Sequence, residues 1–591
     1  MNLNSAEIDR LAIAVEEAAR AASVAKPRFV EPARGTLDRA KAKRHQIVFG
    51  RRGSGKTSLL AKAAADLTVD RRAIAFVNLE TFKGHSYPDV LLSVLIDSLS
   101  KFKDWLETAA TNPASKTTFW RRLFGTTPKR PPLDRKKVGE LAAEIEELIA
   151  DLQTQLYAED AAALKEITEH ALESTDAAEA NAGLKAGPAS VGAKASTKEV
   201  AKQRSQVTEE SRRSKIDFLH RHIIEYQRLL KRIAEVAGGD AYLFLDDLYH
   251  IRKNDQPSLL DYFHRIAKGN DLWLKAGTIR HRTEWYKHSD PPIGVKLGDD
   301  AEEIDLDLTL EKYATAKRFL GSVLQGIADE VEFGPVDNIL ARTAMDRLVL
   351  ACGGVARDFL ALFRRSLDVA RERGGGPGGD RISVPDVNQA AGEYEASKRD
   401  ELKRDTLEER QDVESAFEAV KTFCLERANA NCFLLEKDRT DAGARLIEEL
   451  VDLRLLHLVQ SRVTVRDRPG KLYVAYMLDL GQYTGERKRR AWRWWSSGST
   501  RDGNAFAGQN WCTILARHHR TVAFCLTNDS PIGVITERPI ASVRAPTPLP
   551  HYIVIHMGRS ASQPHQAARQ ARNAGYLSER FPCSDPRSTR R

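Results

Sequence analysis

The stretch Gly50-Arg51-Arg52-Gly53-Ser54-Gly55-Lys56-Thr57-Ser58 matches every fixed position of the phosphate-binding pattern G-x-x-x-x-G-K-[ST]. Its glycines allow successive backbone N–H groups to point into one concavity, where they can hold phosphate oxygens. The Lys56 ammonium can reach the β- and γ-phosphates of a nucleotide, and the Thr57 hydroxyl is a suitable Mg²⁺ ligand. We therefore predict that residues 50–58 bind ATP together with Mg²⁺.

The segments around this loop predict a parallel sheet. The apolar run His45 to Phe49 precedes it, and the strong helix formers Ser58 to Ala65 follow it, which is the strand–loop–helix order that the pattern requires. Continuous apolar runs are typical of strands whose two faces are both covered. Further runs of this kind lie at 73–79, 241–247 and 272–276, and the segment Ile304 to Leu308 would close a five-stranded sheet. We therefore predict an α/β fold.

Two carboxylates end the third predicted strand, Ala241 to Asp247. After a phosphate-binding loop, an apolar strand ending in Asp-Asp is the pattern of a second nucleotide-binding motif, Walker B. Asp246 is expected to hold Mg²⁺ with Thr57, and Asp247 to orient the attacking water as a base.

Three further residues are candidates for contacts to the phosphates. Thr278 ends the strand 272–276 with a polar side chain that could contact the γ-phosphate. Arg280, or its neighbour Arg282, could stabilise charge in the transition state, although surface arginines are a plain alternative. Arg357 starts the helix predicted at 358–373 and could reach back to the nucleotide.

Composition limits the possible classes of protein. The 591 residues are too many for one hydrophobic core, and 42% hydrophobic with 29% charged residues is ordinary globular composition. Without an 18-residue apolar run or a basic-then-apolar start, we expect a cytoplasmic protein with no membrane partner. The six cysteines form no C-x-x-C pair, so we expect neither a disulfide framework nor a zinc site.

The basic net charge of +9 comes almost entirely from one end of the chain. Residues 491–591 contain 13 arginines, no lysine and five acidic residues. The charge is therefore no argument that the rest of the protein binds nucleic acid. We expect the segment 486–591 to be a basic and poorly ordered tail.

A long insertion interrupts the predicted sheet between residues 105 and 215. Apolar residues recur at helical spacing in 141–156, and again in 216–233 just beyond the insertion. Two such helices could pair as an antiparallel hairpin and form an arm that binds a partner, or they could pack onto the core. The sequence leaves both possibilities open.

Taken together, these motifs resemble AAA+ ATPases of the origin-recognition initiator type and the related STAND NTPases. The resemblance rests on the loop, on Asp246-Asp247, on Thr278-Ile279-Arg280 and on Gly353-Gly354-x-x-Arg357. It implies that Thr278 is sensor 1 and that Arg357 is sensor 2, carried on a helical lid over the nucleotide. Asp247 stands where AAA+ enzymes usually have Glu, and the segment Thr-Ile-Arg is more similar to STAND proteins.

The same resemblance implies a winged-helix domain after the lid. Residues 410–485 fit it, with predicted helices at 413–425 and 442–453 and strands at 456–465 and 472–480. If this domain binds DNA, Arg462, Arg466, Arg468 and Lys471 would contact phosphates. The predicted recognition helix also carries Glu448, Glu449 and Asp452, which would repel them, so a protein partner stays equally open.

The sequence thus predicts a Mg²⁺-dependent ATPase that couples its nucleotide state to a conformational change and could act on DNA. The alternative is a STAND-like switch of low turnover in defence or signalling. ATP, duplex DNA or a protein partner, and an ATP-dependent homo-oligomer are the expected partners. The expected segments are an N-terminal helix (1–27), the ATPase core (28–104 and 216–312), the insertion (105–215), the lid (313–400), the winged helix (401–485) and the tail (486–591).

Overall fold

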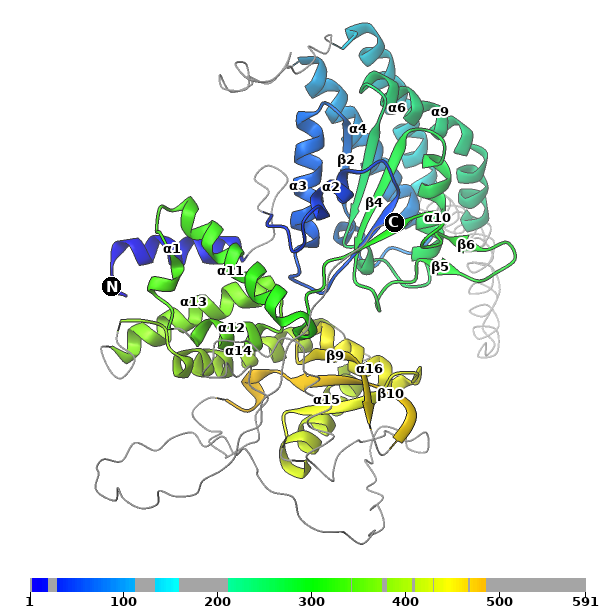
Figure 1. Ribbon diagram of the computed structural model, residues 1–591. Helices are drawn as coiled ribbons and strands as arrows, with labels where there is room; N and C mark the ends of the chain where they lie inside the picture. Colours follow the sequence, from blue (N-terminus) through cyan, green and yellow to red (C-terminus); the bar gives the residue numbers. More distant parts are fainter. Residues whose placement is uncertain are drawn as a thin grey trace, which may run out of the picture. The chain divides into compact units, whose positions relative to one another are not determined.

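The structure is a computed structural model (Figure 1). The predicted tail, the phosphate contact Arg466 and most of the insertion lie outside the residues that the structure describes. The described residues are 3–19, 29–111, 133–158, 211–341, 343–374, 380–405, 410–428, 430–465 and 468–484.

A five-stranded parallel sheet forms the centre of the N-terminal half, in the order β2-β3-β4-β1-β7. This confirms the predicted α/β class. The first four strands lie where they were predicted, but β7, predicted at 304–308, begins at Glu302 and ends at Asp305. The Asp305 side chain accepts a hydrogen bond from the Asp307 N–H, which turns the chain out of the sheet. The strands are β1 (Gln46–Phe49), β2 (Ala73–Asn78), β3 (Ala241–Asp246), β4 (Leu272–Thr278) and β7 (Glu302–Asp305).

Helices cover both faces of this sheet, which explains its continuous apolar strands. Alternate strand residues join two separate cores: Ile47 and Phe49 face one layer of helices, and Val48 faces the other. The first layer contains α4 (Asp89–Thr111), α6 (Arg135–Leu156), α9 (Ile223–Val236) and α10 (Gln256–Ala267), and the second contains α2 (Thr36–Lys41) and α3 (Lys56–Val69).

The described helix of the insertion packs on the core. The apolar side of α6, including Leu141, Ile145 and Leu152, is buried along α4. The second predicted helix, 216–233, is helical as expected apart from a break at His222, and the part after the break, α9, packs on α10 and the sheet. These two helices also contact each other, and Arg232 of α9 pairs with Glu144 of α6. Both apolar stripes are buried in the same core as α4 and α10.

A helical bundle follows the sheet, and the N-terminal helix belongs to it. Helix α1 packs on α11 and α13 (Figure 1), where Ile8, Leu11 and Val15 are fully buried. The Arg371 guanidinium donates to the Asp9 carboxylate at 2.6 Å and joins the same elements. The bundle consists of α1 (Ala6–Ala18), α11 (Tyr313–Glu330), α12 (Ala344–Cys352), α13 (Ala356–Arg373) and α14 (Val384–Asp405).

The C-terminal domain, residues 410–484, has the order helix, strand, helix, strand, strand. Its antiparallel sheet has the order β8-β10-β9, with β9 and β10 forming a hairpin. Its apolar residues share one core with the helical bundle. The elements are α15 (Arg410–Thr422), a π-turn (Phe423–Arg427), β8 (Cys432–Glu436), α16 (Ala442–Asp452), β9 (Leu456–Val465) and β10 (Arg468–Leu478).

A network of buried charges joins these last two parts. Asp358 on α13 accepts from Arg454 at 2.6 Å, and Lys398 on α14 donates to Asp479 at 2.7 Å. The His457 ring also contacts Asp479, at 3.0 Å. All five side chains are at most 3% exposed, so the bundle and the C-terminal domain are held by compensated buried charge as well as by apolar packing.

Within the described ranges, no helix combines the length and the apolar character that crossing a bilayer would require.

Candidate nucleotide site

The loop 50–55 connects the end of β1 to the start of α3, in the strand–loop–helix order expected from the sequence. Gly53 and Gly55 have φ values of 80° and 97°, which L side chains rarely adopt. The buried Lys56 ammonium donates to the backbone carbonyls of Gly50 at 2.8 Å and Arg51 at 3.3 Å. Lys56 therefore folds back across the loop, at the start of a helix whose N-terminal N–H groups favour anions.

The carboxylate Asp246 lies beside this loop at the end of β3. Its pKa is raised to about 7, first by burial and then by the nearby Asp247, while a hydrogen bond from Thr57 opposes the shift. A Cβ atom on Gly277 would lie 2.6 Å from Asp246 Oδ1, so the neighbouring strand leaves room for this carboxylate only because it has glycine there. The Thr57 hydroxyl and Asp246 carboxylate are oxygen ligands of the kind that Mg²⁺ prefers, so this pair fits the metal.

Asp247 follows in a left-handed conformation with φ of 57°, and its N–H donates to Asp246 Oδ1 at 3.1 Å. Burial lowers the pKa of Lys56, and the carboxylates of Asp247 and Asp246 oppose this shift. The structure therefore brings together the predicted residues Lys56, Thr57, Asp246 and Asp247.

Tyr249 is part of the same site, and the sequence analysis missed it. The Lys56 ammonium lies 5.8 Å from its ring centroid, and the Arg52 guanidinium lies 5.6 Å from it. A hydrogen bond also joins Arg52 to the tyrosine side chain. The signal would have been an aromatic residue two positions after Asp247, which is weak in a single sequence.

Thr278 is fully buried at the end of β4. Its carbonyl accepts from the N–H of Gly50 at 3.2 Å, so it lies next to the nucleotide loop as predicted. Its hydroxyl is hydrogen-bonded to the hydroxyl of Thr283, which closes the segment between them into a compact turn.

Arg280 is engaged elsewhere. Its guanidinium stacks over the Phe49 ring at 4.0 Å and pairs with Glu303 at 3.1 Å and Asp305 at 3.6 Å. In the described part of the chain, nothing joins it to Lys56 or to the two aspartates. The structure therefore does not place Arg280 among the catalytic groups.

The helical bundle reaches the loop through the start of α13. The Arg357 N–H donates to the Gly53 carbonyl at 3.3 Å, and a Cβ atom on Gly53 would lie 2.7 Å from that of Arg357. The Arg357 side chain is exposed at this point. The structure thus places Arg357 beside Gly53 of the loop, and its contact with a nucleotide stays a prediction.

The side chain of Arg51 joins the loop to the bundle and points away from the phosphate position. It pairs with Asp307 at 3.3 Å and donates to the carbonyls of Leu308 at 2.9 Å and Gly353 at 3.2 Å. Its backbone N–H also donates to Asp307 Oδ1, at 2.8 Å, so the Arg51 donors that the structure pairs are directed to the segment after β7 and to the bundle. The remaining loop residues predicted to bind the cofactor, Ser54 and Ser58, take their places in the turn and in the first turn of α3.

A second contact reaches the core from the C-terminal domain. Arg282, in the turn after β4, pairs with Glu449 on α16 and lies 3.5 Å from Asp452, while His281 lies 3.0 Å from Asp452. Two of the three acidic residues of α16 that the sequence suggested would repel DNA, Glu449 and Asp452, face the α/β core in this structure. These ion pairs hold α16 next to the end of β4, where Thr278 lies.

This contact should depend on pH. Burial lowers the pKa of His281, but hydrogen bonds to Asp452 and Glu449 outweigh it and raise the pKa to about 9. A raised histidine pKa stabilises the folded state below the unfolded pKa of about 6.5, and this stabilisation is lost as the pH rises through about 9. We expect His281→Gln to lower the melting temperature at pH 7 by an amount equivalent to about 1–3 kcal/mol, and to have little effect at pH 10. An equal effect of the substitution at both pH values would contradict this prediction.

A scan of protein-family models finds no match for this chain, and a search of curated proteins finds no significant one. Solved structures similar to it include two proteins of Aeropyrum pernix. The ORC1 protein of Aeropyrum pernix in complex with DNA has 14% identity and a TM-score of 0.29, over 82% of this chain and 91% of that one. The ORC2 protein of the same organism, as ADPNP–ADP complexes, has 11% identity and a TM-score of 0.32, over 77% and 91%. At such identities and TM-scores the likeness is no guide to function, which has to be argued from the site itself.

Proposed function

We propose that the chain binds ATP with Mg²⁺ at the loop 50–58 and hydrolyses it, as a P-loop ATPase of AAA+ type. One observation carries this proposal. The Lys56 ammonium, the contact between Thr57 and Asp246, and the Asp247 carboxylate lie at one edge of the parallel sheet, where β1 and β3 end. This combination of cation, oxygen ligands and base suits phosphoryl transfer to water.

Each residue would have a distinct role. The loop N–H groups and Lys56 would hold the phosphates, and Thr57 with Asp246 would hold Mg²⁺, which neutralises phosphate charge when bound. Asp247 would take a proton from the attacking water as the bond from water oxygen to the γ-phosphorus forms. Asp247 is one methylene shorter than glutamate, so we propose slow turnover.

Arg357 would sense the γ-phosphate from the helical bundle. We expect Arg357→Ala to weaken ATP binding or turnover about 10-fold or more, because a desolvated guanidinium contact to phosphate is lost. Arg365→Ala on the same helix, whose guanidinium lies over the Tyr394 ring, is the matched control. The measurements are ATP affinity by calorimetry and phosphate release. Wild-type values for both in Arg357→Ala would refute the sensing role.

A second candidate function is a nucleotide-gated switch, and the contact of α16 with the core favours it. We propose that residues 410–484 form a winged helix, with α16 as its second helix and the β9–β10 hairpin as its wing. In this structure Glu449 and Asp452 of α16 pair with Arg282 and His281. In the switch, a partner or ATP would release α16, and oligomerisation would follow.

Turnover with and without DNA distinguishes the two candidates. Phosphate release is measured on the full chain, alone and with duplex DNA at several salt concentrations, with Asp247→Asn as the inactive comparison. Stimulation by DNA that declines with salt would support an ATPase acting on DNA. Tight ATP binding with negligible turnover in both conditions would support the switch. Absence of ATP binding would overturn both.

A further inference from the structure

Two short turns at the edge of the sheet bring a histidine and a second carboxylate beside Asp247. Asn78, the last residue of β2, pairs in register with Asp246 of β3, so both strands end at the same level. The Asn78 side chain accepts from the N–H of Glu80 and starts the 3₁₀ turn Leu79–Phe82. On the neighbouring strand, Asp247 starts the 3₁₀ turn Leu248–His250. The two turns pack on each other.

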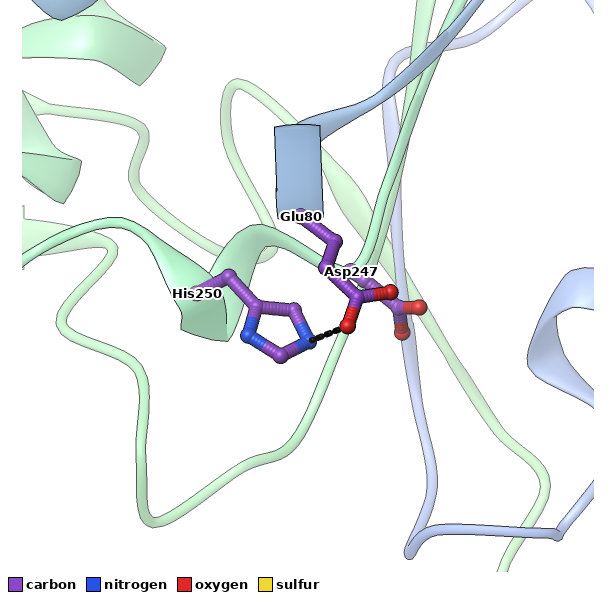
Figure 2. A group of neighbouring side chains, drawn as sticks. All are labelled: Glu80, Asp247 and His250. Carbon is purple, nitrogen blue, oxygen red and sulfur yellow. Dashed lines mark ion pairs between the residues drawn. The ribbon is translucent and has the colours of Figure 1, made fainter. Parts of the chain in front are cut away.

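The side chains of Glu80, Asp247 and His250 meet between these turns (Figure 2). Glu80 Oε1 lies 4.0 Å from His250 Nε2, and one polar atom of each residue lies within 4.8 Å of the others. Three atoms at such separations have a common point within about 2.8 Å of each, which is hydrogen-bonding distance. One water molecule could therefore contact all three groups.

The three residues of the cluster differ in how exposed they are to solvent. The His250 side chain is only 10% exposed, whereas that of Glu80 is 60% exposed. Asp247 lies on the nucleotide side, beside Lys56. The three residues thus connect the position of the proposed base to solvent, through an imidazole that is largely shielded.

We propose that His250 and Glu80 are positioning residues for ATP hydrolysis, which relay to solvent the proton that Asp247 takes from the attacking water. This inference rests on the hydrolysis proposed above. As the new P–O bond forms and the bond between the γ-phosphorus and the bridging oxygen breaks, ADP leaves with the electron pair. The water proton passes to the Asp247 carboxylate, then through a bridging water to the neutral His250 ring, where Glu80 stabilises the imidazolium.

The charges around His250 suit this role. Burial lowers its pKa, so the ring is neutral at pH 7 and can accept a proton. The negative charges of Asp247 and Glu80 partly offset this effect of burial on the His250 pKa. The positive charges of Arg52 in the loop and Lys83 after the first turn add to it. The centroid of the Tyr249 ring lies 4.3 Å from that of the His250 ring. Because Glu80 is the exposed member, its removal should alter the histidine more than the binding of ATP.

Turnover as a function of pH tests the relay on the full chain. We expect His250→Ala to lower kcat on the order of 10²-fold with little change in KM for ATP, and added imidazole to restore part of it. Glu80→Gln should move the acidic limb of the kcat profile about one unit lower, because a carboxylate that favours the imidazolium is lost. His85→Ala, an exposed histidine that follows the first turn, is the control and should match the wild type.

Several outcomes would overturn the relay. The relay is wrong if His250→Ala and Glu80→Gln both keep the wild-type kcat and pH profile. It is also wrong if a lost kcat is restored by Mn²⁺ but not by imidazole, because the cluster would then be a cation site. The melting temperature and the ATP affinity of each variant are also measured. Wild-type values for both show that a change in kcat does not come from misfolding. If the wild type itself shows no ATP turnover, the proposed hydrolysis fails, and the relay with it.

Discussion

Lys56→Ala is expected to reduce ATP turnover by at least 10²-fold and to weaken ATP binding. The Lys56 ammonium is only 5% exposed and already lies across the loop, where its hydrogen bonds go to the Gly50 and Arg51 carbonyls. On binding ATP it would exchange these contacts for phosphate oxygens. The loss of a buried cation opposite developing negative charge costs several kcal/mol in the transition state.

The matched control for this substitution lies on the same helix. Lys62 is 37% exposed and pairs with Asp66 at 2.9 Å, one turn and a half beyond the loop. Lys62→Ala should keep wild-type turnover, because an exposed pair of this kind contributes little. Isothermal titration with ATP and phosphate release provide the measurements. Equal turnover in Lys56→Ala and the wild type would remove the basis of the proposed function.

Asp358→Ala is expected to destabilise the protein by about 3–5 kcal/mol, the cost of breaking a buried ion pair from one side. Asp358 is fully buried, and its carboxylate accepts from Arg454 at 2.6 Å and lies 3.4 Å from the Lys398 ammonium. These cations hold the pKa of Asp358 below its usual range, although burial alone would raise it. Without the carboxylate, the Arg454 guanidinium has lost its buried anion and Lys398 is left to Asp479 alone.

Denaturant unfolding followed by circular dichroism measures this loss, with Asp368→Ala as the control. Asp368 is 45% exposed and pairs with Arg364 within α13, so its removal should cost less than about 1 kcal/mol. A small effect of Asp358→Ala would mean that the bundle and the C-terminal domain are not joined by this network.

The parts of the site that are close in sequence could be predicted. The loop 50–58 and the pair Asp246-Asp247 carry their geometry locally, because glycine positions and a strand end define where their groups point. The first four strands of the sheet also followed from continuous apolar runs, whereas the alternating segment Ile304 to Leu308 gave the wrong bounds for β7, which ends at Asp305.

The contacts that join distant segments could not be predicted. The helical spacing of apolar residues in 141–156 indicated that one face of this helix is buried. It did not indicate that α4 would cover that face, because periodicity shows which side of a helix is apolar but not which element packs on it. The acidic residues of α16 were visible in the sequence, yet only the structure pairs them with His281 and Arg282. Similarly, Glu80 is far from Asp247 in sequence and reaches it only through strand pairing.

The position of α1 has a consequence for the order of folding during synthesis. The buried face of this helix packs on α11 and α13, although the whole sheet, residues 46–305, lies between them in the chain. On a ribosome, α1 emerges before the sheet, and the elements that bury Ile8, Leu11 and Val15 emerge some 300 residues after α1. Domains generally fold as units as they emerge at about 5–20 residues per second. The sheet can therefore be complete while α1 still exposes an apolar stripe for tens of seconds, and in that interval the nascent chain presents a segment that a chaperone could recognise.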